Sequence, residues 1–140
     1  MTKPSAPIGC IGIILNATKT KLFMTKRALS KKYYPGYWEF PGGTYEPSDP
    51  SFRHTIIREL KEELDINVQE PSFLYETKND FDLPIHVFVI SRWSGSLKLR
   101  EDQIGGEWFG LDELKTIKTP SLALEALPRL MDFIAENVNK

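Results

Sequence analysis

Three glutamates near the middle of the chain have a spacing that suits metal binding. Glu62 and Glu63 follow Glu59 by three and four residues, so on a helix all three carboxylates share one face. An acidic helix face is often only a solvated surface. Carboxylate oxygens are also the ligands that Mg²⁺ and Mn²⁺ prefer, usually with substrate phosphates completing the coordination shell. The spacing alone therefore leaves a solvated surface and a metal site as two open interpretations.

The residues before these glutamates predict the elements that position them. An aromatic, apolar run ends in Pro-Gly-Gly at 41–43, which predicts that a strand stops there in a tight turn. Asp49 is expected to cap the following helix, with Pro50 at its first position. Nothing between 51 and 64 breaks a helix. Its buried stripe is expected to consist of three aliphatic residues: Ile57, Leu60 and Leu64.

The segment from the glycines onward resembles the Nudix box, written Gly-x5-Glu-x7-Arg-Glu-U-x-Glu-Glu-x-Gly-U, where U is a bulky aliphatic residue. Gly43 opens the pattern, residues 58–63 match its core without a gap, and Ile66 closes it. A match this complete is specific. The chain is therefore identified as a member of the Nudix family, and the resemblance favours the metal site over the solvated surface.

Two departures from the box concern the loop and the helix end. The interval from Gly43 to Arg58 is one residue longer than in the pattern, so Asp49 or Pro50 stands where the box has its first Glu. In the family that Glu supports the loop and the Arg, and Asp49 is expected to do so from a shifted position. Asp65 replaces the late Gly, and Asp tolerates the left-handed conformation of a helix end better than most residues.

The resemblance implies an α/β protein of the α+β type, with the mixed β-sheet of the Nudix fold sandwiched between helices. It also implies the metal site, with Mg²⁺ as the cofactor and Mn²⁺ as its substitute. Arg58 would orient Glu59, and Glu59 or Glu101 would accept the proton from water; a one-residue shift would replace Glu101 by its neighbour Asp102. The implied metal ligands are the Gly42 carbonyl, Glu59, Glu62, Glu63 and Glu101.

The sequence Trp-Glu-Phe-Pro-Gly-Gly at 38–43 is similar to the MutT-like branch of the family, which acts on nucleoside triphosphates. In that branch an Arg at the position of Arg27 faces the nucleotide, although a surface cation is the simpler explanation. Glu39 is a charge within an apolar strand and should be paired, with Arg27 as the candidate partner. Two further substrate contacts are expected: Gly43 and Phe81. The Lys- and Tyr-rich loop at 28–36 either lines the mouth of the site or is solvated.

The implied reaction is metal-dependent hydrolysis of a nucleoside triphosphate, an oxidised one such as 8-oxo-dGTP included, to the monophosphate and pyrophosphate. An Asn that 8-oxoguanine-reading relatives carry after the last strand has no counterpart at 121–123. Hydrolysis of ADP-ribose or nucleotide sugars therefore stays open. Two other functions also stay open. One is isopentenyl-diphosphate isomerase activity, which would need a catalytic Cys, whereas the chain has only Cys10. The other is a non-catalytic nucleotide sensor.

Size and composition fit a small enzyme. The 140 residues suffice for one domain, expected at 8–140 after a flexible lead-in at 1–7. The net charge of −1 gives no support for a nucleic-acid polymer or a membrane surface as partner. No run suits a signal peptide or a membrane span, so a cytoplasmic location is expected. A homodimer is a partner that the resemblance allows, since many relatives are dimers.

The remaining segments predict strands and a terminal helix. A helical turn is expected at 111–116, and a C-terminal helix should start at Thr119-Pro120 and be kinked or split by Pro128. The other strands are expected at 8–15, 21–25, 37–40, 68–78, 83–93 and 107–109.

Overall fold

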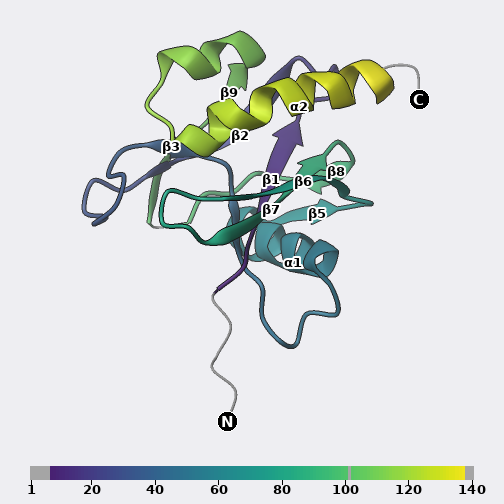
Figure 1. Cartoon of the computed structure of the whole chain (residues 1–140), viewed down its shortest axis with the longest axis horizontal. Coiled ribbons are helices and arrows are strands. Elements are labelled where there is room, and N and C mark those ends of the chain that lie inside the picture. The colour runs from purple at the N-terminus through teal and green to yellow at the C-terminus, as the bar shows by residue number, and fades with distance from the viewer. Residues whose placement is uncertain (1–6, 101, 138–140) are drawn as a thin grey trace.

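The computed structural model describes residues 7–100 and 102–137. A seven-stranded mixed sheet lies between two helices, α1 (Phe52–Leu64) and α2 (Ser121–Asn137), which cover opposite faces of it (Figure 1). The strands of this sheet are β1 (Gly9–Leu15), β2 (Lys21–Arg27), β3 (Trp38–Glu39), β4 (Gly42–Thr44), β6 (Ser72–Lys78), β7 (Pro84–Ile90) and β9 (Gln103–Gly110). They run in the order β3-β2-β1-β7-β6, with β4 beside β1 and β9 beside β2. The α+β Nudix architecture predicted from the sequence is confirmed.

Parallel pairing of β1 with β7 places two apolar strands at the centre of the sheet. Side chains of a strand alternate between its faces, so each of these strands contributes to two separate hydrophobic cores. On β1, Ile13 belongs to the core under α2, whereas Ile14 belongs to the core under α1. On β7, Val87 belongs to the core under α2 and Phe88 to the core under α1. Residues of β7 are therefore buried on both faces of the sheet.

The predicted tight turn at 41–43 is wrong, because Gly42 and Gly43 belong to strand β4 and pair antiparallel with β1. A Cβ on Gly42 would collide with the backbone of Cys10. The missing side chain therefore serves close approach of two strands rather than reversal of the chain. The Pro41 carbonyl accepts a hydrogen bond from Gly12 N–H at 2.9 Å, which continues the contact with β1.

The N-cap of helix α1 lies two residues later in the sequence than predicted. Ser51, not Asp49, is the N-cap, and its hydroxyl accepts the His54 N–H at 3.2 Å. Ile56 rather than Ile57 joins Leu60 and Leu64 in the buried stripe. At the other end Asp65 adopts the left-handed conformation expected of it, with φ 56° and ψ 43°. The helix that carries the three glutamates is thus fixed at both ends.

The C-terminal helix α2 continues without interruption through Pro128, which excludes the split, one of the two effects predicted for this proline. The proline lacks the N–H that would reach the Leu124 carbonyl. Both residues lie on the exposed side of the helix, where water can satisfy that carbonyl. The 3₁₀ helix η1 (Leu111–Thr116) precedes α2 and confirms the helical turn predicted there.

Several strand boundaries differ from the prediction. The 68–78 and 83–93 segments each divide in two, because β5 (Ile66–Val68) and β8 (Trp93–Gly95) form a separate two-stranded sheet. Strand β9 is longer than expected and pairs with β2 along its length. No helix among residues 7–100 and 102–137 has the length and apolar character needed to span a membrane. The predicted flexible lead-in falls, for residues 1–6, outside the described residues.

Candidate active site

Arg58 holds two of the three helix carboxylates. Its Nη1 donates to Glu59 Oε1 at 2.9 Å and to Glu62 Oε2 at 3.3 Å. The same guanidinium donates through Nη2 to the Thr44 carbonyl at 3.2 Å, which ties the helix to β4. The geometry agrees with the predicted role of Arg58 in orienting Glu59, and it shows how the like charges on this face coexist.

Asp49 supplies the support that the family box assigns to its first Glu. Its two carboxylate oxygens accept from Nε and Nη2 of Arg58, each at 2.9 Å. The side chain is buried, and it also accepts the Thr55 hydroxyl at 2.9 Å and the Glu46 N–H at 3.0 Å. The hydrogen bonds from Arg58 hold the pKa of Asp49 well below its usual range. The one-residue longer loop therefore still delivers a carboxylate to the arginine.

Gly43 provides the surface against which the Glu59 side chain lies. A Cβ at this position would overlap the Glu59 carboxyl group. Any side chain here would displace that carboxylate from its place between β4 and Arg58. The glycine is required because a functional group approaches the backbone closely, and this accounts for its place at the start of the box.

Glu63 is held differently from its two neighbours. Its Oε2 accepts the Gly42 N–H at 3.1 Å, and its Oε1 accepts Nε2 of Gln103 at 2.6 Å. Burial raises the pKa of Glu63 from 4.5 to about 7, and the Gly42 hydrogen bond opposes that rise. Gln103 is a contact that the sequence prediction missed. The available signal was its position two residues after Glu101, one of the implied metal ligands.

The donor chemistry of this cluster suits a divalent cation, since it offers several hard oxygen ligands around a glycine-lined space. Among residues 7–100 and 102–137, no three acidic, histidine or cysteine side chains converge on one point. The reason is visible in the contacts, because Arg58 draws Glu59 and Glu62 toward itself. The ligand set Gly42, Glu59, Glu62 and Glu63 stays a prediction. Glu101 lies outside the described residues.

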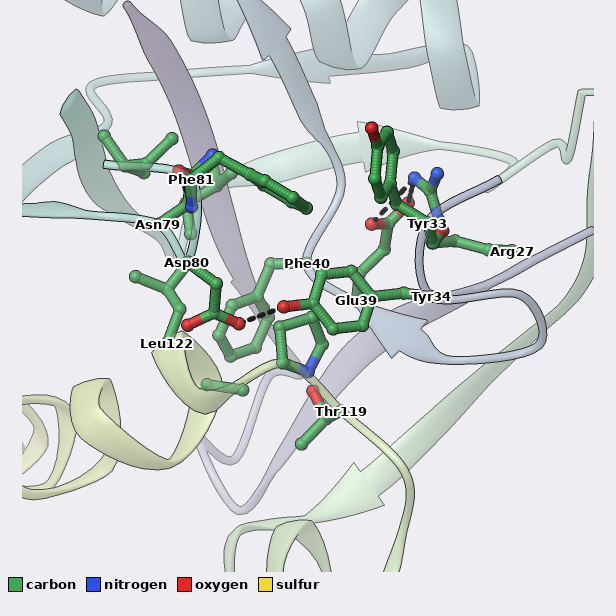
Figure 2. A pocket seen from close by; sticks show the side chains of 14 residues that line it. Arg27, Tyr33, Tyr34, Glu39, Phe40, Asn79, Asp80, Phe81, Thr119 and Leu122 are labelled. Carbon is green, nitrogen blue, oxygen red and sulfur yellow. Dashed lines mark hydrogen bonds and ion pairs between the residues drawn. The ribbon is translucent and has the colours of Figure 1, made fainter. Parts of the chain in front are cut away.

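An aromatic cavity of about 280 Å³ lies next to the carboxylate cluster, between β3, the 79–83 hairpin tip and the start of α2 (Figure 2). Arg27 and Glu39 form its charged wall, where Arg27 Nη1 lies 3.3 Å from both Glu39 oxygens. The predicted pairing of these two residues is confirmed. Burial raises the pKa of Glu39 above its ordinary value, and Arg27 opposes the rise. The other lining side chains include Ile11, Tyr33, Tyr34, Phe40, Phe81 and Leu122.

Contacts across this cavity connect segments that are distant in sequence. The Tyr34 hydroxyl donates to Asp80 (Figure 2). The other oxygen of this carboxylate accepts a hydrogen bond from the Ser121 hydroxyl at 2.7 Å. The rings of Tyr33 and Phe81 meet edge to face with centroids 4.8 Å apart. Both tyrosines therefore line the cavity, with Tyr33 half exposed to solvent. Phe81 lies where a planar ligand could reach it, as the sequence prediction of a substrate contact requires.

The aromatic cavity adjoins a second cavity at the carboxylate cluster. This second cavity has a volume of about 260 Å³ and is lined by Gly42, Gly43 and Glu63, among others. Five residues border both cavities: Ile11, Arg27, Glu39, Phe40 and Ile85. A ligand can thus place an aromatic ring at one end and an anionic group at the other. That combination matches a nucleotide.

Sequence comparison gives the chain a family. Residues 7–130 match the NUDIX domain. The chain is 34% identical over 112 residues to the 8-oxo-dGTP diphosphatase of Buchnera aphidicola subsp. Schizaphis graminum, covering 79% of this chain and 82% of that protein. It is 31% identical over 104 residues to the 8-oxo-dGTP diphosphatase of Escherichia coli K12, covering 72% of this chain and 78% of that one.

Structural comparison agrees. A solved structure of MutT, from work on the Aliivibrio salmonicida and Vibrio cholerae proteins, superposes with a TM-score of 0.77 at 27% identity. The superposition covers 91% of this chain and 98% of that chain. The family match spans most of the sequence and includes the helix with its glutamates. The chain belongs to the Nudix hydrolase family, in its MutT-like branch.

Proposed function

We propose that the protein hydrolyses a nucleoside triphosphate to the monophosphate and pyrophosphate, with 8-oxo-dGTP as the first substrate to test. The observation that carries this proposal is that the aromatic cavity shares its charged wall, Arg27 and Glu39, with the cavity at the carboxylate cluster. A nucleobase fits the first and a triphosphate reaches the second. The relatives described above supply the candidate base, because both are 8-oxo-dGTP diphosphatases.

The aromatic end supplies binding and orientation of the base. Tyr33, Phe81 and Phe40 offer ring faces and edges for stacking. Arg27 and Glu39 add hydrogen-bonding groups at the border with the phosphate end. An Arg–Glu pair can present both a donor and an acceptor to one base edge. In this proposal these residues select the base and hold the phosphates in line with the helix.

The carboxylate end supplies the chemistry. Nudix hydrolases generally need a divalent metal ion; in the proposal it is Mg²⁺, which Mn²⁺ can replace. When bound, the ion neutralises charge on phosphoryl oxygens and lowers the pKa of the attacking water. Glu59, Glu62, Glu63 and the Gly42 carbonyl would hold it. Glu59, oriented by Arg58, or Glu101 would accept the proton from water. Positioning and charge stabilisation carry most of the rate.

The isomerase alternative is disfavoured by the state of the chain's single cysteine. Cys10 is fully buried in the core under α1. Burial raises the pKa of its thiol to about 11. A thiol in this state is neither ionised at neutral pH nor accessible to a substrate. A nucleotide substrate, by contrast, fits the cytoplasmic location that is part of the proposal.

A substrate panel tests the proposed reaction. Purified protein with Mg²⁺ is incubated with dGTP, 8-oxo-dGTP, the other nucleoside triphosphates, ADP-ribose and a nucleotide sugar. Pyrophosphate is measured as phosphate after addition of pyrophosphatase, and the nucleotide product is identified by chromatography. We expect turnover of at least one triphosphate to its monophosphate, abolished by EDTA. Glu63→Gln serves as the inactive control.

Two results would change the proposal in different ways. Release of single phosphates, or turnover that persists in EDTA, would overturn the metal-dependent pyrophosphohydrolase. Selective turnover of ADP-ribose or a nucleotide sugar would keep the reaction class and replace the substrate. The chain has Ser-Leu-Ala at 121–123, where 8-oxoguanine-reading relatives carry an Asn. The identity of the nucleobase is therefore the least constrained part of the proposal.

A further inference from the structure

Gln103 contacts the helix glutamate that Arg58 does not hold. It is the first residue of β9 and pairs with Arg27 at the end of β2. Its Nε2 donates to Glu63 Oε1 at 2.6 Å. The contact joins residues 40 positions apart. Only the tertiary fold brings them together.

The amide of Gln103 is oriented from both sides. Its Oε1 accepts the Arg100 N–H at 3.0 Å, so the NH₂ group is the one that faces Glu63. A carboxylate accepts hydrogen bonds and cannot donate one, which requires the same orientation. Each Glu63 oxygen receives one donor, from Gln103 or from Gly42. Each oxygen keeps a lone pair for a further partner such as a cation.

Gln103 is also held through its backbone at the start of β9. Its N–H donates to the Arg100 carbonyl at 3.1 Å. The preceding residue, Asp102, lies 3.4 Å from Lys31, whose loop carries the tyrosines of the aromatic cavity. Gln103 therefore links the end of α1 to a residue that contacts the nucleotide side of the site.

We propose that Gln103 is a positioning residue, which fixes the Glu63 carboxylate in the arrangement that receives the metal ion. The inference rests on the proposed function, in which Glu63 is a metal ligand. Gln103 acts through Glu63 and touches neither substrate nor ion. Its loss frees the Glu63 side chain to rotate, so the ion binds more weakly, while the walls of the aromatic cavity stay in place.

The test is direct ion binding to the metal-free protein, measured with Mn²⁺ by calorimetry and by electron paramagnetic resonance. Gln103→Met keeps the length of the side chain and removes the donor. Gln103→Glu keeps the shape and turns a carboxylate toward Glu63. We expect Gln103→Met to weaken Mn²⁺ affinity by about 10–100-fold, as loss of an outer partner of a metal ligand usually does. Gln103→Glu adds a negative charge that attracts a cation, so it should bind Mn²⁺ more tightly than Gln103→Met.

Gln69→Met is the matched control, because Gln69 is exposed and lies in the connection between β5 and β6. Its Mn²⁺ affinity should equal that of the wild type. Kinetics give a second readout: at saturating Mg²⁺ the nucleotide KM of Gln103→Met should stay within about twofold of wild type, whereas the Mg²⁺ concentration for half-maximal rate should rise with the loss of affinity.

The outcomes separate this inference from the proposed function. Equal Mn²⁺ affinity of wild type and of both Gln103 variants would overturn the role of Gln103. A raised nucleotide KM with unchanged Mn²⁺ affinity would also overturn it, because Gln103 would then act on substrate binding. If the wild-type protein binds Mn²⁺ but hydrolyses no nucleotide, the proposed function is overturned. The Mn²⁺ affinities of the Gln103 variants would then still decide whether Gln103 positions Glu63.

Discussion

At the scale of single residues, the three helix glutamates differ in what balances their charge. Glu59 and Glu62 share the guanidinium of Arg58. Glu63 receives its hydrogen bonds from a backbone N–H and a neutral amide. Without an ion, Glu63 is therefore the carboxylate whose charge is least compensated by its hydrogen-bond partners. We therefore expect a bound cation to stabilise the charge of Glu63 more than that of Glu59 or Glu62.

The substitution Glu63→Gln removes that charge and keeps the shape of the side chain. We expect kcat to fall by about 10²–10³-fold, since a group that stabilises charge in the transition state is lost. The melting temperature of the metal-free protein should change little, because the lower desolvation cost of a neutral amide opposes the loss of one of the two hydrogen bonds that Glu63 accepts. Pyrophosphate release and thermal melting measure the two effects. Near-normal turnover would contradict the metal assignment.

The pKa of Glu63, about 7 in the metal-free protein, predicts a pH effect. An ion binds the deprotonated carboxylate, so Mn²⁺ affinity should rise from pH 6 to pH 8 with release of a proton. Because the pKa is higher folded than unfolded, the protonated form stabilises the fold. That contribution is complete below about pH 4.5 and is lost as the pH rises through 7. Calorimetry in buffers of different ionisation enthalpy detects the proton, which Glu63→Gln should abolish.

At the scale of elements, the ends of α1 carry the departures from the family pattern. Asp65 adopts a left-handed backbone conformation. This conformation is unfavourable for residues with a side chain and almost free of strain for glycine. Its ion pair with Lys61, at 2.9 Å, is between two exposed side chains and contributes little. Asp65→Gly, which restores the family residue, should raise Tm by about 2–4 °C and leave kcat unchanged.

Asp65→Ala is the control for that prediction. It removes the ion pair but keeps a Cβ in the left-handed region, so Tm should fall below wild type. Thermal melting monitored by circular dichroism compares the three proteins at one pH and ionic strength. A lower Tm for Asp65→Gly would mean that the ion pair with Lys61 outweighs the backbone strain.

The elements also explain how far the sequence predicts the site. Contacts within α1 follow from helix periodicity, so the shared face of the glutamates and the role of Arg58 could be predicted. The cap could not, because both Asp49 and Ser51 can cap a helix and Arg58 competes for Asp49. The prediction of a turn at 41–43 was wrong for a related reason. A glycine pair suits a turn and a close strand contact equally, and only the position of β1 decides between them.

At the scale of the whole molecule, the parts of the site that the sequence did not predict are those that depend on packing between distant segments. Gln103 reaches Glu63 because β9 pairs with β2 and places its first residue beside Arg27. The aromatic cavity forms because the 28–37 loop, the 79–83 hairpin tip and the start of α2 meet at one end of the sheet. Each segment taken alone is an ordinary polar or aromatic loop.

These segments are joined across the cavity chiefly by side chains, through Tyr34, Asp80 and Ser121 and through the Tyr33–Phe81 ring contact. A bound nucleotide should therefore stabilise segments that contact each other only weakly without it. We expect hydrogen exchange in 28–37 and 79–83 to slow by about tenfold when the product monophosphate is present at ten times its Kd, because opening is suppressed by a factor of one plus the ratio of ligand to Kd.

The turn at 16–20 serves as the reference for this measurement, since it lies outside the aromatic cavity and is held by its own Asn16 side chain. Its exchange should be unchanged by the nucleotide. A different hollow, lined by Lys19, Glu70 and Arg92, offers charged groups that could also attract a phosphate. Protection confined to the segments around that hollow would place the nucleotide there and contradict the aromatic cavity as the base site. Protection at 28–37 and 79–83, lost in a variant such as Phe81→Ala, would support it.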